Sequence, residues 1–222
     1  MTPFWLSIQV ALCALVIIIM VGLAVNYFFK RYTFPGKALI DAIITLPLVL
    51  PPVVVGFALL MFFSPGHAFG AWLKEVGVTV VFSKIGAIIA SSIIGFPLFY
   101  QTVKSALESV DASIEDVART LGASELRIFF TISLPLAWRG LLTGSILAFS
   151  RALGEFGATI LIAGNIPGIT QTMPLAIYSN VEAGDYSAAF TIVVYICALT
   201  LALLWSVHLI TTGSLFKQGR QQ

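Results

Sequence analysis

Charged residues are scarce in this sequence of 222 residues. Asp, Glu, Lys and Arg together make up 10% of it, against roughly 25% in soluble domains, while the hydrophobic set makes up 59%. A chain with so little polar surface cannot cover its own core in water, which excludes a disordered protein, a nucleic-acid binder and an ordinary soluble enzyme. The formal net charge of +2 is too small to indicate a polyanionic partner. The composition indicates a polytopic membrane protein.

Cysteine and histidine are also rare, and neither is spaced as in a metal site. Cys13 and Cys197 stand far apart within apolar runs, so we expect small buried side chains rather than a disulfide or metal ligands. His67 and His208 are isolated and fall on opposite predicted sides of the membrane. The sequence has neither a GxxxxGK(S/T) phosphate loop nor a GxSxG nucleophile motif. We therefore expect no metal site, no catalytic residue and no ATP hydrolysis in this chain.

Five segments are long and apolar enough to cross a membrane, since a helix needs about 20 apolar residues to do so. The predicted spans cover residues 4–29, 38–63, 85–103, 140–163 and 188–210. The charged residues deep within them are Asp41 in the second span and Arg151 and Glu155 in the fourth. The first segment is too long for the apolar core of a signal peptide and has no Lys or Arg before it, so we expect it to stay in the membrane.

Lys and Arg are distributed unevenly between the two predicted sides of the membrane. Nine fall on one side: Lys30, Arg31, Lys37, Lys104, Arg119, Arg127, Arg139, Lys217 and Arg220. Two, Lys74 and Lys84, fall on the other side, where segment 164–187 has none. Because cytoplasmic segments carry the excess of basic residues, we expect the N-terminus outside and the C-terminus in the cytoplasm.

The second predicted span contains three prolines within six residues, Pro47, Pro51 and Pro52. Each proline lacks an N–H and clashes with the preceding helical turn, so this span cannot be an unbroken helix. The carbonyl groups that lose their partners must be buried in protein or face water. The break is either a kink that helps packing or a bent element that lines a pathway. Pro97 in the third span is a weaker case of the same kind.

The fourth predicted span combines a stripe of small residues with two charges. Gly140, Gly144, Ala148 and Ala152 recur every four residues, which predicts a face that another helix approaches closely, within the subunit or across a dimer. Arg151 and Glu155 are four residues apart and can form an ion pair on one helix face. The pair either holds helices together or belongs to a hydrated cavity.

Segment 104–139 is the longest polar stretch and predicts two short helices. Asp111 or Ser113 can cap the first, and Ser113 with Asp116 forms a capping-box pattern. Gly122 suits a left-handed position after that helix, and Ser124 can cap the second. In this second helix Leu126, Phe129 and Phe130 would form an apolar face, and Pro135 would end it. Such a hairpin lies on the lipid surface or docks into a groove of a partner.

This segment resembles a motif of the permease subunits of bacterial ABC importers. The family pattern is EAA, three residues, Gly, nine residues and Ile-x-Leu-Pro. The sequence has Asp116-Val117-Ala118, then Gly122, then Ile132-Ser-Leu-Pro135, with matching spacing between predicted spans on the positive side. Asp for Glu and Val for Ala are departures, and Glu115 stands beside the expected acid.

A narrower likeness is to the molybdate and sulfate permeases of this family. It rests on Thr45-Leu-Pro-Leu-Val-Leu-Pro-Pro-Val-Val-Val-Gly56, on Ala148-Phe-Ser-Arg-Ala-Leu-Gly-Glu-Phe-Gly157 and on Gln171-Thr-Met-Pro-Leu-Ala-Ile-Tyr178. The likeness runs from Lys37 to Tyr178, most of the chain. The form with five spans is similar to molybdate permeases, whereas sulfate permeases usually have an additional span.

The resemblance implies an all-α permease of the type I ABC importer architecture, in the bacterial inner membrane and without a cofactor of its own. Its implied partners are a second copy of the chain, two cytoplasmic ATPase subunits that use ATP and Mg²⁺, and an extracytoplasmic oxyanion-binding protein. Segment 104–139 would be the coupling loop. The residues that the resemblance implies for coupling to the ATPase are Asp111, Glu115, Asp116, Val117, Ala118, Arg119, Gly122, Leu134 and Pro135.

The resemblance implies import of molybdate by alternating access, with sulfate, tungstate or thiosulfate as alternative cargo. A gradient-driven transporter is a further alternative, although it usually has inverted repeats and more ionisable residues within the membrane. A path that bound a doubly charged tetraoxyanion tightly would trap it, so we expect hydroxyl and backbone N–H groups along it. The pathway or gate candidates are Thr45, Pro51, Ser91 and Ser92.

Overall fold

The computed structural model describes residues 2–212, with side chains up to Leu209, and this range is helical without β-strands. Lys217 and Arg220, which contribute to the predicted orientation, lie outside the described residues. The elements are α1 (Pro3–Arg31), α2 (Lys37–Val49), α3 (Pro52–Phe63), α4 (Ala68–Glu75), α5 (Lys84–Glu108), α6 (Ala112–Thr120), α7 (Glu125–Ile128), the π-helical turn η1 (Phe129–Ser133), α8 (Leu134–Leu136), α9 (Trp138–Leu153), α10 (Gly157–Ile162), α11 (Met173–Glu182) and α12 (Tyr186–Thr212). The prediction of an all-helical chain is confirmed.

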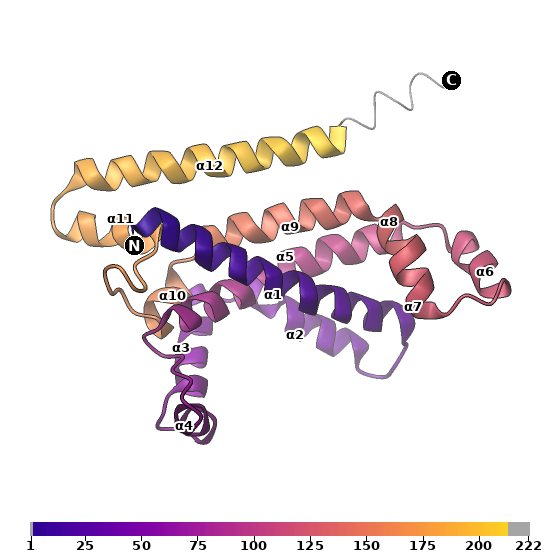
Figure 1. The fold of residues 1–222 in the computed structure, drawn as a ribbon, viewed down its shortest axis with the longest axis horizontal. Coiled ribbons are helices and arrows are strands. Elements are labelled where there is room, and N and C mark those ends of the chain that lie inside the picture. The colour runs from indigo at the N-terminus through magenta and orange to yellow at the C-terminus, as the bar shows by residue number, and fades with distance from the viewer. Residues whose placement is uncertain (1, 213–222) are drawn as a thin grey trace.

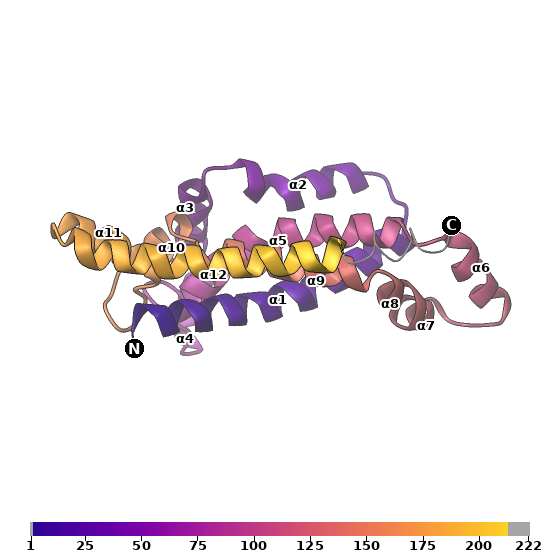
Figure 2. The ribbon, with the colours of Figure 1, turned by 90° about the horizontal axis from the view of Figure 1, so that it is seen from above.

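Helices α1, α5 and α9 lie side by side and form the core of the bundle (Figure 1 and Figure 2). The contact of α9 with α5 depends on the small residues predicted as a packing face. A Cβ atom at Gly140 would lie 2.1 Å from Ala106 Cβ, and one at Gly144 would lie 3.3 Å from Thr102 Cβ. Ala148 on the same stripe is fully buried. Larger side chains would push α9 away from α5, so this face is used for packing within the subunit.

Three helices, α1, α5 and α12, are each long and apolar enough to cross a membrane. Two bent helix pairs pass the same test together: α2 with α3 at 112°, and segment Glu125–Leu136 with α9 at 77°. The described part of the chain therefore has three to five candidate spans. The second predicted span corresponds to the pair of α2 and α3, whereas the fourth, residues 140–163, covers α9 and α10 and not the segment Glu125–Leu136.

The second predicted span breaks at its prolines. Helix α2 ends at Val49, Leu50 is extended, and Pro52 is the first residue of α3. Pro47 is accommodated inside α2, and Pro97 inside α5, which continues without interruption from Lys84 to Glu108. After the bend, α3 packs against α10.

The fourth predicted span, residues 140–163, is two helices rather than one. Helix α9 ends at Leu153 and α10 begins at Gly157. Glu155 lies in the break, and its Oε1 accepts a hydrogen bond from the N–H of Ala158 at 2.7 Å. The expectation of one continuous helix is wrong because this carboxylate caps the start of a new helix.

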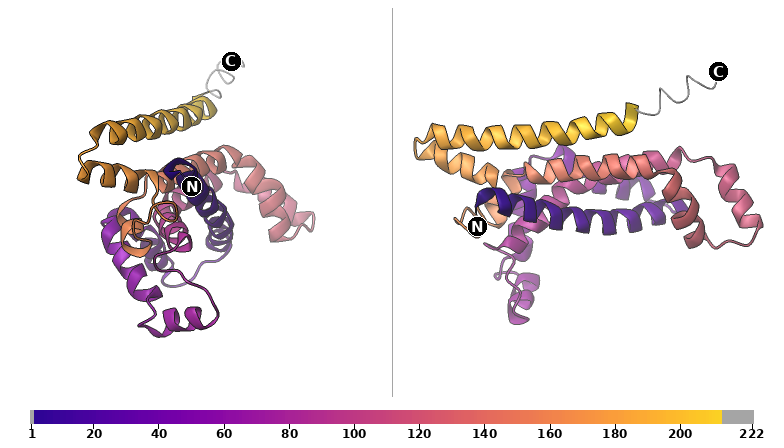
Figure 3. Two further views of the ribbon diagram at one scale, coloured as in Figure 1. Left: turned by 60° about the vertical axis from the view of Figure 1, so that its left-hand side comes forward. Right: turned by 45° about the horizontal axis from the view of Figure 1, so that its top comes forward.

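The segments predicted to share the cytoplasmic side, 30–37 and 104–139, lie at one end of the bundle (Figure 1 and Figure 3). Lys30 at the end of α1 forms an ion pair with Glu115 of α6 there. At the opposite end Lys84, the first residue of α5, donates a hydrogen bond to Gln9 of α1. Helix α12 runs along the side of the bundle, from α11 toward the end that carries the loop (Figure 3).

Cys13 and Cys197 are free thiols on exposed faces of α1 and α12. The expectation that both are buried is wrong for the single chain. Helix α12 is the clearest reason, since only 6% of its most apolar stretch is buried against the rest of the chain. Within residues 2–212, no three His, Cys, Asp or Glu side chains come together as metal ligands.

Candidate functional site

The first loop helix, α6, has a distinct cap at each end. The carboxylate of Asp111 accepts a hydrogen bond from the N–H of Ser113 at 2.9 Å, and this bond holds the pKa of Asp111 below its ordinary value. The cap is therefore fully formed above the ordinary pKa of aspartate and is lost as the pH falls through the lowered pKa. Ser113 lies within the helix, so Asp111 is the cap and the capping box expected from Ser113 and Asp116 is not formed.

Gly122 ends the first loop helix in the left-handed conformation, with φ of +82°. Its N–H donates to the carbonyl of Arg119 at 2.9 Å, and the N–H of Ala123 donates to that of Ala118 at 3.0 Å. These two bonds satisfy carbonyl groups that the end of a helix leaves free. A Cβ atom at Gly122 would meet nothing within 4 Å, so within the chain the glycine is needed for its backbone conformation.

The second loop helix ends at Leu136, one residue after the proline expected to end it. Ser124 Oγ caps α7 by accepting from the N–H of Arg127 at 3.4 Å, and the chain then runs through η1 and α8, which contains Pro135. The change of direction comes at Ala137, before α9. The prediction that this helix ends at Pro135 is confirmed to within one residue.

The apolar face expected on this second helix is only partly buried. Phe129 is 3% exposed, whereas Leu126 and Phe130 are each 55% exposed. The predicted apolar face is confirmed as a packing surface for Phe129, whose ring packs against that of Tyr27 of α1 with the centroids 5.2 Å apart. Leu126 and Phe130 remain available to lipid or to a partner.

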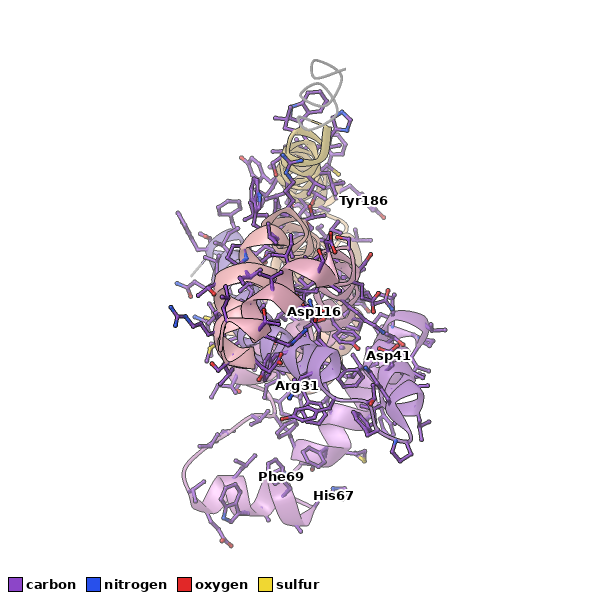
Figure 4. All side chains as sticks on the ribbon, turned by 90° about the vertical axis from the view of Figure 1, so that its right-hand side faces the viewer. Arg31, Asp41, His67, Phe69, Asp116 and Tyr186 are labelled. Atoms are coloured by element: carbon purple, nitrogen blue, oxygen red, sulfur yellow. The ribbon has the colours of Figure 1, made fainter. Side chains whose placement is uncertain are left out.

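Glu115 is the buried acid of the loop, with 5% of its surface exposed. Its Oε1 accepts hydrogen bonds from Lys30 Nζ of α1 and, at 2.6 Å, from Ser133 Oγ of η1. Asp116, which occupies the acidic position of the motif, is exposed and pairs with Arg119 of its own helix at 2.5 Å. Figure 4 looks onto this end of the molecule, with Asp116 and Arg31 labelled. Glu115, and not the expected acid Asp116, therefore joins α6 to α1 and to η1.

Arg119 connects the two loop helices across the turn at Gly122. Its Nε lies 2.8 Å from Glu125 Oε1, and its Nη2 lies 3.3 Å from Glu125 Oε2. This two-point contact raises the pKa of Arg119 and lowers the pKa of Glu125. The hairpin is therefore closed by a charge pair as well as by its backbone.

One face of α6 carries apolar side chains that point away from the chain. Ile114, Val117 and Leu121 are 45%, 59% and 82% exposed, and their spacing places them along one side of the helix. Ala118 is partly buried, as are Leu134 and Ile132 of the motif's second half, while Pro135 is exposed.

The intramembrane charges form an ion pair, with Arg151 Nη1 lying 2.8 Å from Glu155 Oε2. Glu155 is 2% exposed, and its other oxygen caps α10. The pair thus joins the end of α9 to the start of the next helix. A carboxylate in this setting needs both partners, since a buried charge without them is strongly unfavourable.

The four pathway candidates do not share one cavity. Thr45 donates to the carbonyl of Asp41 at 3.0 Å, and Ser92 donates to that of Ile88 at 2.7 Å. Ser91 is 1% exposed, and Pro51 is exposed at the bend between α2 and α3. Of the four, Ser92 alone lines an apolar hollow of about 340 Å³ between α1, α2 and α5.

Sequence reasoning missed a polar contact that attaches α2 to the bundle. Asp41 accepts hydrogen bonds from Tyr100 Oη at 2.5 Å and from Lys104 Nζ at 2.9 Å, both on α5. Because α2 has no buried residues, these hydrogen bonds help to hold α2 in place against α5. An isolated acid near the end of one span and a lysine near the end of the next are the signal that could have found it.

Residues 18–213 match the family described as "Binding-protein-dependent transport system inner membrane component". The chain belongs to this family. This transport component is 44% identical over 211 residues to the "Molybdenum transport system permease protein ModB" of Escherichia coli strain K12, with 92% of each chain covered. It is 37% identical over 187 residues to the "Sulfate transport system permease protein CysT" of the same organism, covering 84% of this chain and 68% of the relative.

A solved structure shows the fold of this transport component at low sequence identity. A chain in the structure of a "bacterial alginate ABC transporter in complex with alginate pentasaccharide-bound periplasmic protein" superposes with a TM-score of 0.73 at 16% identity, covering 93% of this chain and 76% of that one. The predicted resemblance to ABC importer permeases is confirmed. As an inner membrane component of a transport system, the chain is a transport subunit and not an enzyme.

Proposed function

We propose that this permease is the membrane subunit through which molybdate enters the cell in an ATP-driven, binding-protein-dependent importer. The main support for this proposal is the 44% identity to the molybdenum permease, which extends over 92% of both chains. The sulfate permease is less similar, at 37% identity, and 32% of its length has no counterpart in the alignment, since the alignment covers 68% of it. Equal coverage of both chains favours molybdate over sulfate.

In the proposed topology the chain crosses the inner membrane five times, with the N-terminus outside and the C-terminus in the cytoplasm. In this topology α2 with α3 forms the second crossing, and α9 with the following helix α10 forms the fourth. The split of nine basic residues on one side against two on the other supports this orientation. Segment 104–139 then lies in the cytoplasm, and α4 and α11 lie toward the outside.

The proposed assembly contains two copies of this chain, two cytoplasmic ATPase subunits that bind ATP and Mg²⁺, and an extracytoplasmic oxyanion-binding protein. The absence of a phosphate loop in the sequence supports a separate ATPase. A similar fold occurs in a transporter solved in complex with a periplasmic protein. Helix α6 is the proposed coupling helix, because it is capped at both ends and exposes an apolar face.

Transport proceeds by alternating access in this proposal. ATP binding closes the ATPase pair, the coupling helices move with it, and the spans open to the outside. Reversing an equilibrium from 1:99 to 99:1 takes about 5.5 kcal/mol of differential binding. The loop must transmit this free energy without deforming, and the Arg119–Glu125 contact across the turn supports such rigidity.

The proposed pathway uses weakly binding groups, with Thr45, Pro51, Ser91 and Ser92 as its candidates. The hydroxyl groups of Thr45 and Ser92 donate to helix carbonyls here, so they can rotate toward an anion when the helices move. Arg151 is paired with Glu155, which reduces its attraction for a dianion.

Anion uptake into proteoliposomes that contain the complete transporter tests the proposed function. We expect uptake of molybdate that requires ATP and the binding protein and that an excess of sulfate does not suppress. Uptake of sulfate in preference to molybdate would assign the chain to the sulfate permeases. Uptake driven by an ion gradient without ATP would overturn the proposal.

Substitution of Gly122 separates backbone conformation from fit to the ATPase. Gly122→Trp is expected to leave the complex assembled but to uncouple ATP hydrolysis from anion uptake. A tryptophan strains the left-handed backbone at this position, and its large side chain prevents the turn from fitting closely against the ATPase. Gly122→Asn, which tolerates this backbone conformation, should retain most of the coupling. The measurement is the number of anions imported per ATP hydrolysed, and normal uptake by an assembled Gly122→Trp transporter would contradict the prediction.

A further inference from the structure

We propose that Lys30 and Glu115 form a latch that makes the last turn of α1 move together with α6. The inference rests on the proposed function of segment 104–139 as the coupling loop. It assigns Lys30 as a positioning residue for coupling, in an element that the motif does not include. Movement of α6 would then reach the first span directly, besides the chain connections of the loop to α5 and α9.

The latch is built around a buried carboxylate. Glu115 is 5% exposed, and its Oε1 receives both Lys30 Nζ and, at 2.6 Å, Ser133 Oγ. Its Oε2 lies 3.7 Å from Arg119 Nη2. The charge therefore has partners on α1, on η1 and on its own helix. Because a buried carboxylate requires such partners, movement of α6 away from Lys30 would remove its close ammonium partner and leave Arg119, at 3.7 Å, as the remaining cation.

Lys30 is held from a second side as well. Its Nζ donates to the carbonyl of Leu107 on α5 at 3.3 Å, so one ammonium group joins α1, α5 and α6. One turn earlier, the ring of Tyr27 packs on buried Phe129 with an interplanar angle of 70°. The polar contact of Lys30 and the ring contact of Tyr27 lie at the same end of α1. This end of α1 therefore packs against the loop at two points.

The π-helical turn positions Ser133 for this contact. A π-turn widens the helix and often occurs at functional sites. Here η1 runs from Phe129 to Ser133, and both of these end residues are buried. One faces Tyr27 and the other bonds to Glu115. The irregular turn therefore supplies two contacts: Phe129 packs against Tyr27 at the end of α1, and Ser133 bonds to Glu115, the acid that pairs with Lys30.

The first test replaces the charged pair by a neutral one, Lys30→Met with Glu115→Gln, which leaves no buried charge unpaired. In the reconstituted full transporter, we expect the ATPase to co-purify as in the wild type. The number of anions imported per ATP should fall about fivefold or more, the lower range of coupling between linked sites. Lys84→Met is the matched control, since it removes a lysine contact to α1 at the opposite end and should leave the ratio unchanged. An unchanged ratio in the neutral pair would overturn the latch.

The second test restores the connection covalently. Lys30→Cys and Glu115→Cys are combined in a background with Cys13→Ala and Cys197→Ala, and a homobifunctional methanethiosulfonate reagent bridges the new thiols. A bridging reagent is needed because long side chains span this contact, whereas a disulfide requires close Cα atoms. We expect poor coupling before bridging and restored coupling after it. A bridged transporter that stays uncoupled or stops importing shows that the two residues do not move as one unit.

These tests distinguish failure of the latch from failure of the proposed function. If wild-type permease brings down no ATPase, or imports the anion without hydrolysis, the coupling loop and the latch both fail. If the wild type couples normally and the neutral pair couples equally well, only the latch fails.

Discussion

Leu121→Asp is expected to release the ATPase subunits from this permease. Leu121 is 82% exposed at the end of α6 and continues the apolar face formed by Ile114 and Val117. Full burial of such a side chain in a partner's groove contributes about 1.5–3 kcal/mol, and a carboxylate in its place would have to be desolvated as well. The affinity of the loop for the ATPase should therefore fall by about 100-fold or more, as for a central interface residue.

Co-purification and titration of the ATPase against the detergent-solubilised permease measure this effect. Val76→Asp is a suitable control, because Val76 is 55% exposed next to α4 at the other end of the molecule. It introduces the same charge and should leave ATPase binding intact. Retention of the ATPase by Leu121→Asp would mean that the exposed face of α6 is not the docking surface, and a lipid-facing loop would then be the better interpretation.

Glu155→Ala is expected to cause the largest loss of stability among single substitutions in the membrane region. The substitution removes the partner of Arg151, at 2.8 Å, and the cap of α10, at 2.7 Å, in one step. Breaking a buried ion pair from one side costs about 3–5 kcal/mol. The cost here lies toward the lower end of that range, because Arg151, which loses its partner, is 31% exposed. The loss should appear as a much lower midpoint of unfolding in detergent.

A double variant separates the charge from the cap. Arg151→Leu with Glu155→Gln leaves no unpaired charge, and the amide oxygen of glutamine can still accept from the N–H of Ala158. We expect this variant to recover most of the stability that Glu155→Ala loses, since a buried pair can be replaced by neutral groups at little cost. Equal destabilisation by both variants would show that the charge pair itself maintains the junction of α9 and α10.

Features that depend on a few neighbouring residues were predictable. The caps at Asp111 and Ser124 and the left-handed backbone of Gly122 follow from side-chain and backbone chemistry within one helical turn. The break after α2 follows from clustered prolines that cannot donate hydrogen bonds. The packing face on α9 follows from small residues repeated at the helical period.

The errors share a different physical origin. Ser113 and Asp116 form a capping-box pattern in the sequence, but Asp111 is the residue that caps α6. Residues 140–163 were expected to form one helix, but the helix breaks at Glu155, whose carboxylate accepts a hydrogen bond from the N–H of Ala158 at the start of α10. In both places several local conformations are compatible with the sequence, and packing against other helices selects one of them.

Apolar length, basic-residue asymmetry and motif spacing determine this protein's class: an all-helical membrane component with a capped loop of family-specific pattern. They do so because each acts over a span or a turn and needs no knowledge of the rest. The choice of Glu115 rather than Asp116 as the buried acid was decided only by the packed structure. Its partner Lys30 lies 85 residues away, and the Asp41–Tyr100 bond joins residues 59 apart. Such contacts exist only once the helices pack and water is removed from between them, which is when a carboxylate must find its partner.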